Sequence, residues 1–246
     1  MTADPWTLAL AMFAALCVGV SKAGFGGLSM ISVVLFAEIY GARVSTGLAL
    51  PLLIVADLTV YPAFRRFGSW RPVWPLLLPT ALGLLGGWFL LGRIDDAVAR
   101  RVIGWVVLAM VAVQLGRRWW PHAYQEMADS RGFGLAAGIA GGFATMLANA
   151  AGPIIQLFLL SRRFGKMDMV GVGARFFLLV NLAKVPLSAG LSLISPASLL
   201  ENAKLLPAMW LGVWLGGKLL QRVPQRLFEW LVVIFAILAG LRLALT

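Results

Sequence analysis

Residues 21–27 read Ser-Lys-Ala-Gly-Phe-Gly-Gly, and this small and polar stretch interrupts an apolar segment that runs from residue 7 to residue 36. At 1.5 Å of rise per residue, an unbroken helix of that length is too long for one ordinary crossing of a bilayer. A loop that breaks a helix at membrane depth survives only where protein or a water-filled cavity satisfies its backbone. The stretch therefore predicts two half-helices that meet at an internal cavity.

A second interruption of the same kind lies in the other half of the chain. Residues 149–153 read Asn-Ala-Ala-Gly-Pro and divide the long apolar segment 132–160. Its Gly152 lies 128 positions after Gly24 of the first interruption. Proline is tolerated in the first turn of a helix, so a second half-helix is expected to begin at Gly152.

Residues downstream of the two interruptions also match in order. Asp57 and Asn181 lie 124 positions apart, as do Pro62 and Pro186. This common order predicts two repeats, residues 1–116 and residues 132–246, joined by a cytoplasmic linker at residues 117–131.

Composition places both repeats in a membrane. Of the 246 residues, 61% are apolar and 13% are charged, whereas soluble domains are about half apolar and a quarter charged. The fold class expected is an all-α polytopic membrane protein. Its eight apolar segments are 7–36, 44–64, 72–92, 97–116, 132–160, 169–193, 205–221 and 227–245.

Charge distribution bears on whether the two long segments cross the membrane or turn back. If both are re-entrant, 12 basic residues face the cytoplasm and 6 face outward; if both cross, the best split is 8 against 10. Because cytoplasmic loops carry the excess of Lys and Arg, re-entry is favoured. The 12 are Arg65, Arg66, Arg71, Arg117, Arg118, Arg131, Arg162, Arg163, Lys166, Lys218, Arg222 and Arg226.

Re-entry leaves three crossings per repeat, an odd number, so the second repeat is inverted relative to the first and both termini lie outside the cytoplasm. Inverted repeats are a common plan of secondary transporters. Eight full crossings with parallel repeats remain the alternative.

Several functional classes are excluded. The chain has no ATP-binding phosphate loop. The single Cys17 and single His122 cannot build a disulfide or a multi-histidine metal site, so no cofactor or metal is expected. We assign the net charge of +11 to cytoplasmic loops rather than to nucleic acid. No catalytic constellation lies at membrane depth, which argues against an enzyme.

The interruptions supply most of the expected binding groups. A half-helix beginning near Leu28 or Ser29 would point its N–H groups and positive dipole end at the cavity, which suits an anion. The expected substrate-binding residues are Ser21, Lys22, Gly24, Gly26, Gly27, Ser29, Asn149, Gly152, Arg175 and Asn181. Lys22 is expected to turn inward, with snorkelling to an interface as the alternative.

Two further ionisable groups lie within predicted spans. Asp57 is the carboxylate placed deepest in a predicted span, and Lys184 lies deep in residues 169–193. Either both serve in coupling to protons or sodium, or they form a structural ion pair with each other.

The sequence resembles the TauE/SafE sulfite exporter family over nearly its whole length. The resemblance rests on Gly24-Phe25-Gly26-Gly27 in the first repeat and on Gly152-Pro153-Ile154-Ile155 in the second. The chain has Leu28 where the family often has a third glycine, and it lacks the proline that often follows, which leaves the identity of the anion open. The resemblance implies a small sulfur oxyanion such as sulfite or an organosulfonate.

The function expected is therefore a permease that moves such an anion across the cytoplasmic membrane by alternating access. A membrane scaffold that recruits a partner is the alternative. The expected partners are the anion and membrane lipid, not nucleic acid. Homo-oligomerisation through the glycine-rich helix faces stays open.

Overall fold

The structure, a computed structural model, describes residues 4–24, 26–130, 132–162, 164–222 and 225–245. Phe25, Arg131 and Arg163 of the sequence analysis lie outside them. The described residues form helices only: α1 (Pro5–Lys22), a 3-10 turn (Gly26–Leu28), α2 (Ser29–Tyr40), α3 (Ala42–Phe64), α4 (Trp74–Leu91), α5 (Asp96–Trp119), α6 (Pro121–Asp129), α7 (Phe133–Ala148), α8 (Gly152–Ser161), α9 (Lys166–Gly190), α10 (Pro196–Arg222) and α11 (Gln225–Leu245).

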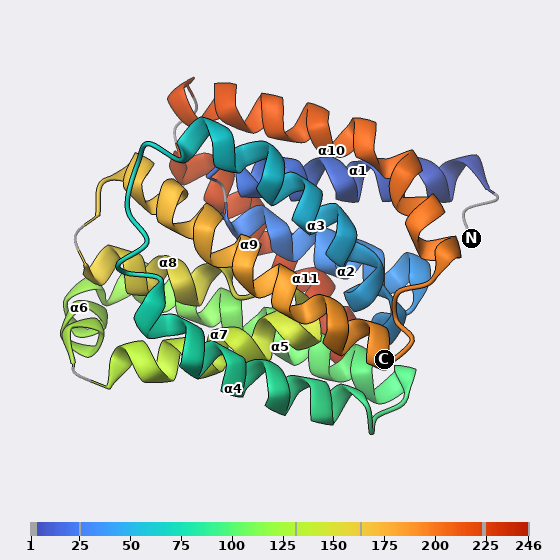
Figure 1. The fold of residues 1–246 in the computed structure, drawn as a ribbon, viewed down its shortest axis with the longest axis horizontal. Helices are drawn as coiled ribbons and strands as arrows, with labels where there is room; N and C mark the ends of the chain where they lie inside the picture. The colour runs from blue at the N-terminus through green and yellow to red at the C-terminus, as the bar shows by residue number, and fades with distance from the viewer. Residues whose placement is uncertain (1–3, 25, 131, 163, 223–224, 246) are drawn as a thin grey trace.

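Both long apolar segments are broken where the sequence predicts. In the first, α1 ends at Lys22, Gly24 takes a φ of 125°, and α2 begins at Ser29 after the 3-10 turn. In the second, Asn149 ends α7 with a φ of 53°, a left-handed conformation that asparagine tolerates. Helix α2 packs against α1, and α8 packs against α7 (Figure 1). Each broken segment is therefore a pair of packed helices.

The connections fall at two ends of the molecule. Figure 1 shows α6 at one end, together with the α3–α4 connection, the start of α9 and the end of α10, and we call this the linker end. The chain termini lie toward the other end, which we call the terminal end. Helix α1 starts at the terminal end and α7 starts at the linker end. Arg65, Arg66 and Arg71 belong to the α3–α4 connection, which lies at the linker end (Figure 1).

Helix contacts join the two halves of the chain. Helix α1 packs on α10 and α4 packs on α7, while α3 packs on α9 and α5 packs on α11. The first two crossings are close because glycines face backbone. A Cβ on Gly19 would lie 2.1 Å from the Met209 carbonyl oxygen, and one on Gly83 would lie 2.1 Å from that of Ile139. No larger residue fits at either crossing.

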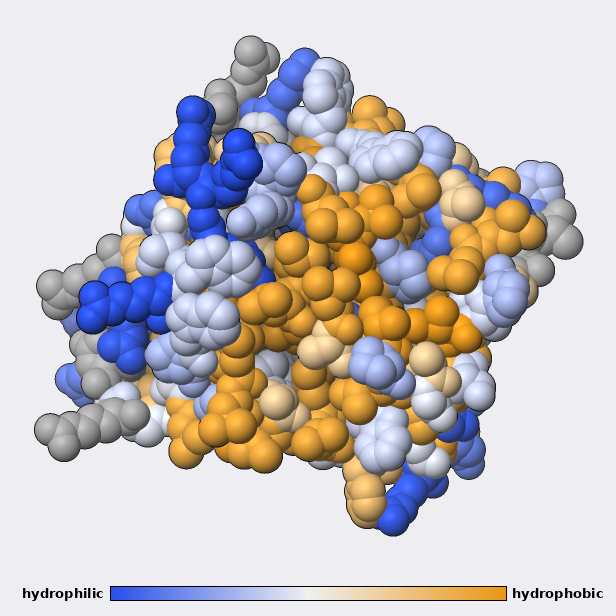
Figure 2. Space-filling view, viewed as in Figure 1, coloured by the Kyte–Doolittle hydropathy of each residue, from blue (hydrophilic) through white to orange (hydrophobic). Residues whose placement is uncertain are grey.

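The outer surface suits lipid. Five of the described helices are long and apolar enough to cross a membrane: Pro5–Lys22, Ala42–Phe64, Trp74–Leu91, Asp96–Trp119 and Met167–Gly190; three apolar helices are shorter. Large apolar side chains such as Leu78, Leu200 and Leu238 are mostly exposed. In Figure 2 hydrophobic side chains cover the middle of the visible face, and strongly hydrophilic ones gather toward its margins. The protein is a multi-pass helical membrane protein.

Helix α10 differs from its predicted segment, because it begins at Pro196 rather than near residue 205. Ser195 and Ser198 exchange hydrogen bonds between side chain and backbone N–H at this start. The added turns are polar, and hydropathy alone misses them. They bury Glu201, whose carboxylate accepts hydrogen bonds from Tyr40 and Lys204. Asp57 is therefore not the only buried carboxylate in a long helix.

Candidate functional site

A cavity of about 380 Å³ lies where the two breaks meet. The first break lines it with Ser21, Lys22 and Gly24, and the second lines it with Asn149 and Gly152. The residues of the first break lie more than 120 positions before those of the second. The cavity therefore exists only because the two halves of the chain pack together. A volume of this size is at the lower end of ordinary small-molecule sites, which are roughly 300–1,000 Å³.

Two helix N-termini reach the cavity. Ser29, the first residue of α2, and Gly152, the first residue of α8, both line it. The residues before them, Leu28 and Ala151, make no side-chain cap bond, in keeping with their apolar side chains. The positive ends of two helix dipoles, neither of them capped by a side chain, favour negative charge at this place.

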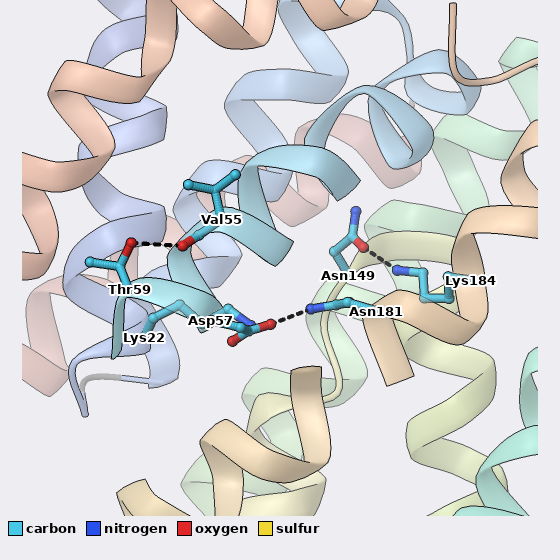
Figure 3. A network of polar contacts seen from close by, with 7 residues as sticks. All are labelled: Lys22, Val55, Asp57, Thr59, Asn149, Asn181 and Lys184. Carbon is cyan, nitrogen blue, oxygen red and sulfur yellow. Dashed lines mark hydrogen bonds and ion pairs between the residues drawn. The ribbon is translucent and has the colours of Figure 1, made fainter. Parts of the chain in front are cut away.

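Lys22 turns inward and pairs with Asp57. Its Nζ lies 2.6 Å from Asp57 Oδ1, and the side chain is 13% exposed. The other Asp57 oxygen accepts a hydrogen bond of 2.7 Å from Asn181 Nδ2 (Figure 3). Phe177 lies beneath the ammonium group, with 4.7 Å from Nζ to the ring centroid. Lys22 therefore forms an ion pair with Asp57 and also lines the cavity.

Lys184 holds the second break. Its Nζ donates to the Thr145 carbonyl oxygen at 2.8 Å and to Asn149 Oδ1. Asn149 Nδ2 donates in turn to the carbonyl oxygen of Thr46, at 3.1 Å, so this amide links α9, α7 and α3. Figure 3 shows the two bonded pairs, Asn149 with Lys184 and Asn181 with Asp57. Asp57 takes its ion pair from Lys22, not from Lys184.

Arg175 lies away from the cavity. Its guanidinium donates to the carbonyl oxygens of Phe67 at 2.8 Å and Gly171 at 2.7 Å, and also to that of Arg65. It also lies 5.7 Å from the ring centroids of Tyr61 and Trp70. These contacts fix the chain that leaves α3 against α9, which is a structural role.

The structure brings eight of the twelve predicted site residues to the cavity wall. They are Ser21, Lys22, Gly24, Ser29, Asp57, Asn149, Gly152 and Asn181. Gly26 and Gly27 belong to the adjacent 3-10 turn, and Lys184 lies behind Asn149. Only Arg175 of the twelve has its side chain engaged elsewhere.

Three polar residues that line the cavity were not predicted from the sequence. Thr145 and Gln156 come from α7 and α8, and Arg117 comes from the last turns of α5 at the linker end. Arg117 was counted as a loop charge only. Gln156 lies four positions after Gly152, so the two share one face of α8. This spacing predicts that Gln156 lines the cavity when Gly152 does. The remaining wall is mostly apolar, with Leu53, Ile155, Leu159, Val170 and Phe177 among its residues.

Comparison with known proteins agrees with this geometry. The family model described as "Sulfite exporter TauE/SafE" matches residues 11–243. No curated protein and no solved structure matches the chain. The family match covers nearly the whole chain, including both breaks and every cavity-lining residue named above. The chain therefore belongs to the TauE/SafE sulfite exporter family, a family of membrane transporters for sulfur anions.

Proposed function

We propose that the protein moves a small sulfur oxyanion, sulfite or an organosulfonate such as sulfoacetate, across the cytoplasmic membrane by alternating access. The observation that carries this proposal is the cavity between the two breaks, where Lys22 and two uncapped helix N-termini face one space. An oxyanion binds well to such a set, because charge-assisted hydrogen bonds are stronger than neutral ones.

The anion would bind between the two breaks. Lys22 supplies positive charge, Ser21 and Ser29 supply hydroxyl groups, and Asn149 supplies its amide. The backbone around Gly24 and Gly152 brings N–H groups close, and Asn181 holds Asp57 in place. Arg175 is not part of this proposed site.

Two inverted repeats of three crossings and one re-entrant hairpin each are the architecture that we propose. Three observations support it. Helix α7 starts 128 positions after α1 (Phe133 against Pro5) and α9 starts 124 after α3 (Lys166 against Ala42), the offsets of the sequence repeat. Exchanging each helix for its counterpart turns the α1–α10 contact into the α7–α4 contact. Helices α1 and α7 start at opposite ends (Figure 1).

The direction of transport follows from electrostatics. An interior-negative membrane drives a monoanion outward by about 2.3 kcal/mol per 100 mV, so export needs no coupling ion. Import would need protons or sodium, and Asp57 beside Lys22 is the group at the cavity that serves this role. The excess of basic residues at the linker end supports a cytoplasmic location for that end.

Flux from proteoliposomes tests the function. Purified protein is reconstituted with sulfite inside, a membrane potential is imposed, and sulfoacetate, sulfate and chloride are added in turn as competitors. We expect potential-driven efflux that one sulfur oxyanion blocks and chloride does not. Flux equal to that of empty liposomes, from folded protein and with protons and sodium also supplied, would contradict transport and favour the scaffold.

A further inference from the structure

A second, much smaller cavity lies on the other side of the breaks. Its volume is about 20 Å³, enough for a single water. It lies between α2, the first half of α3 and α5, whereas the large cavity is lined by Arg117 in the last turn of α5 and by the first turns of α9. Its lining residues are Val18, Ser29, Ser32, Val33, Phe36, Ser45, Thr46, Ala49, Leu53, Ile103, Ala148 and Asn149.

The small cavity is lined by the counterparts of residues that line the large one. On α3, Ser45, Thr46, Ala49 and Leu53 line the small cavity; 124 positions later on α9, Met169, Val170, Gly173 and Phe177 line the large one.

The short helices repeat this correspondence. Residues Ser29, Ser32, Val33 and Phe36 of α2 line the small cavity, and Gly152, Ile155, Gln156 and Leu159 of α8, each 123 positions later, line the large one. That offset is the one between the helix starts, Ser29 and Gly152. Eight positions on two helices thus match in register.

Four residues line both cavities: Val18, Ser29, Leu53 and Asn149. They form the partition between the two spaces. A ligand that passes from one side of the membrane to the other must contact residues that both sides share. The polar members, Ser29 and Asn149, come from the two breaks, one from each half of the chain.

We propose that the small cavity is the closed, outward-facing counterpart of the large one, and that α2 and α3 open it into a hydroxyl-lined anion path when the inner cavity closes. This inference rests on the proposed function and deepens it. The structure then represents the state open toward the linker end, with Ser29 and Asn149 as the groups that hold the anion in both states.

The two paths differ in chemistry. The outward one carries the hydroxyl groups of Ser32, Ser45 and Thr46, where the inward one carries Ile155, Met169 and Val170. In the closed state each hydroxyl donates to a backbone carbonyl oxygen three residues earlier. A hydroxyl group rotates and can donate to an anion instead once the path opens. We therefore expect the outward path to contact a hydrated oxyanion by hydrogen bonds.

Single cysteines report which path is open. In a Cys17→Ala background, Thr46→Cys probes the outward path and Val170→Cys, its counterpart, probes the inward one. The reagent is 2-sulfonatoethyl methanethiosulfonate, which does not cross membranes, applied to spheroplasts and to inside-out vesicles. We expect Val170→Cys to react only from the linker end and Thr46→Cys only from the terminal end.

Two bulky substitutions shift the equilibrium in opposite directions. Ala49→Trp cannot fit in the closed 20 Å³ space and should hold the outward path open. Its counterpart Gly173→Trp enters open space, since a Cβ at Gly173 meets no described atom within 4 Å, and should hold the inward path open. We expect Ala49→Trp to raise Thr46→Cys labelling about tenfold and to lower Val170→Cys labelling, because labelling follows the open fraction. Gly173→Trp should do the reverse.

The controls separate this inference from the function that it rests on. Reaction of Thr46→Cys from the linker end, or labelling that folded Ala49→Trp and Gly173→Trp leave unchanged, would overturn the inference. If Ala49→Trp does not fold, the test is Thr46→Cys labelling during sulfite efflux, expected to be about tenfold faster than in Gly173→Trp; equal rates would overturn the inference. Flux in the Cys17→Ala parent tests the proposed function itself, independently of labelling.

Discussion

The two breaks both separate a longer helix from a shorter one, and they carry different charges. At the first, the cation is on the break, because Lys22 ends α1, and its carboxylate partner Asp57 comes from α3. At the second, a neutral amide is on the break, because Asn149 ends α7, and the lysine that binds it, Lys184, comes from α9. Two lysines therefore surround the meeting point with one carboxylate. This difference leaves an excess of positive groups for an anion.

The pair on α3 and α9 shows a second difference. Asp57 and Asn181, which the proposed repeat makes counterparts, hydrogen-bond to each other. Two aspartates there would repel, whereas an amide donates to the carboxylate. If the proposed repeat holds, the contact between these counterpart positions therefore carries one charge rather than two.

The largest effect is expected from Lys22→Ala. It leaves Asp57 buried without its ion pair, which costs about 3–5 kcal/mol of folding stability, and it removes the charge at the cavity. The double variant Lys22→Ala/Asp57→Asn should regain most of the stability but not sulfite binding. Thermal unfolding and equilibrium binding in detergent measure the two. Full sulfite affinity in the folded double variant would remove Lys22 from the site.

The close crossings of the two halves should respond alike. Gly19→Ala and Gly83→Ala each place a Cβ 2.1 Å from a carbonyl oxygen, and we expect each to lose about 1–3 kcal/mol in unfolding free energy. Gly217→Ala on α10 is the matched control, because a Cβ there meets no described atom within 4 Å. If only one crossing is sensitive, the two are not equivalent.

Arg175→Lys tests whether the arginine is structural. A lysine cannot donate to three carbonyl oxygens with a planar fork, so stability should fall by about 1–2 kcal/mol while sulfite affinity stays within about twofold. Denaturant unfolding and binding are compared in the same preparation. A large loss of sulfite affinity with unchanged stability would show that Arg175 binds the anion.

The smallest effect on stability is expected from Lys184→Met, which replaces a buried lysine by an apolar chain of similar length. Stability should change by less than about 1 kcal/mol, because no carboxylate is left unpaired. Asn149 loses its anchor, so flux should fall about tenfold, as expected for one hydrogen bond to a charged group. Proteoliposome flux and thermal unfolding measure both, and wild-type flux would show that Lys184 does not position Asn149.

Much of the fold could be predicted because the deciding signals are local. Glycine, asparagine and proline at residues 21–27 and 149–153 determine where helices end, whatever surrounds them. The start of α10 was missed because Glu201 and Asn202 are polar by type, and only packing against α2 and α3 buries them.

In the candidate site, too, some features follow from local sequence and others only from helix packing. That Lys22 and Asn149 lie at breaks beside a cavity could be predicted, because short-range chemistry sets where each helix ends. That Lys22 pairs with Asp57, that Lys184 binds Asn149 and that Arg175 binds backbone carbonyls could not be predicted. Helix packing also leaves a cavity of about 380 Å³ between the breaks and one of only about 20 Å³ beside it. The physical reason is that each partner comes from another helix, and helix packing, not residue type, sets which side chains meet.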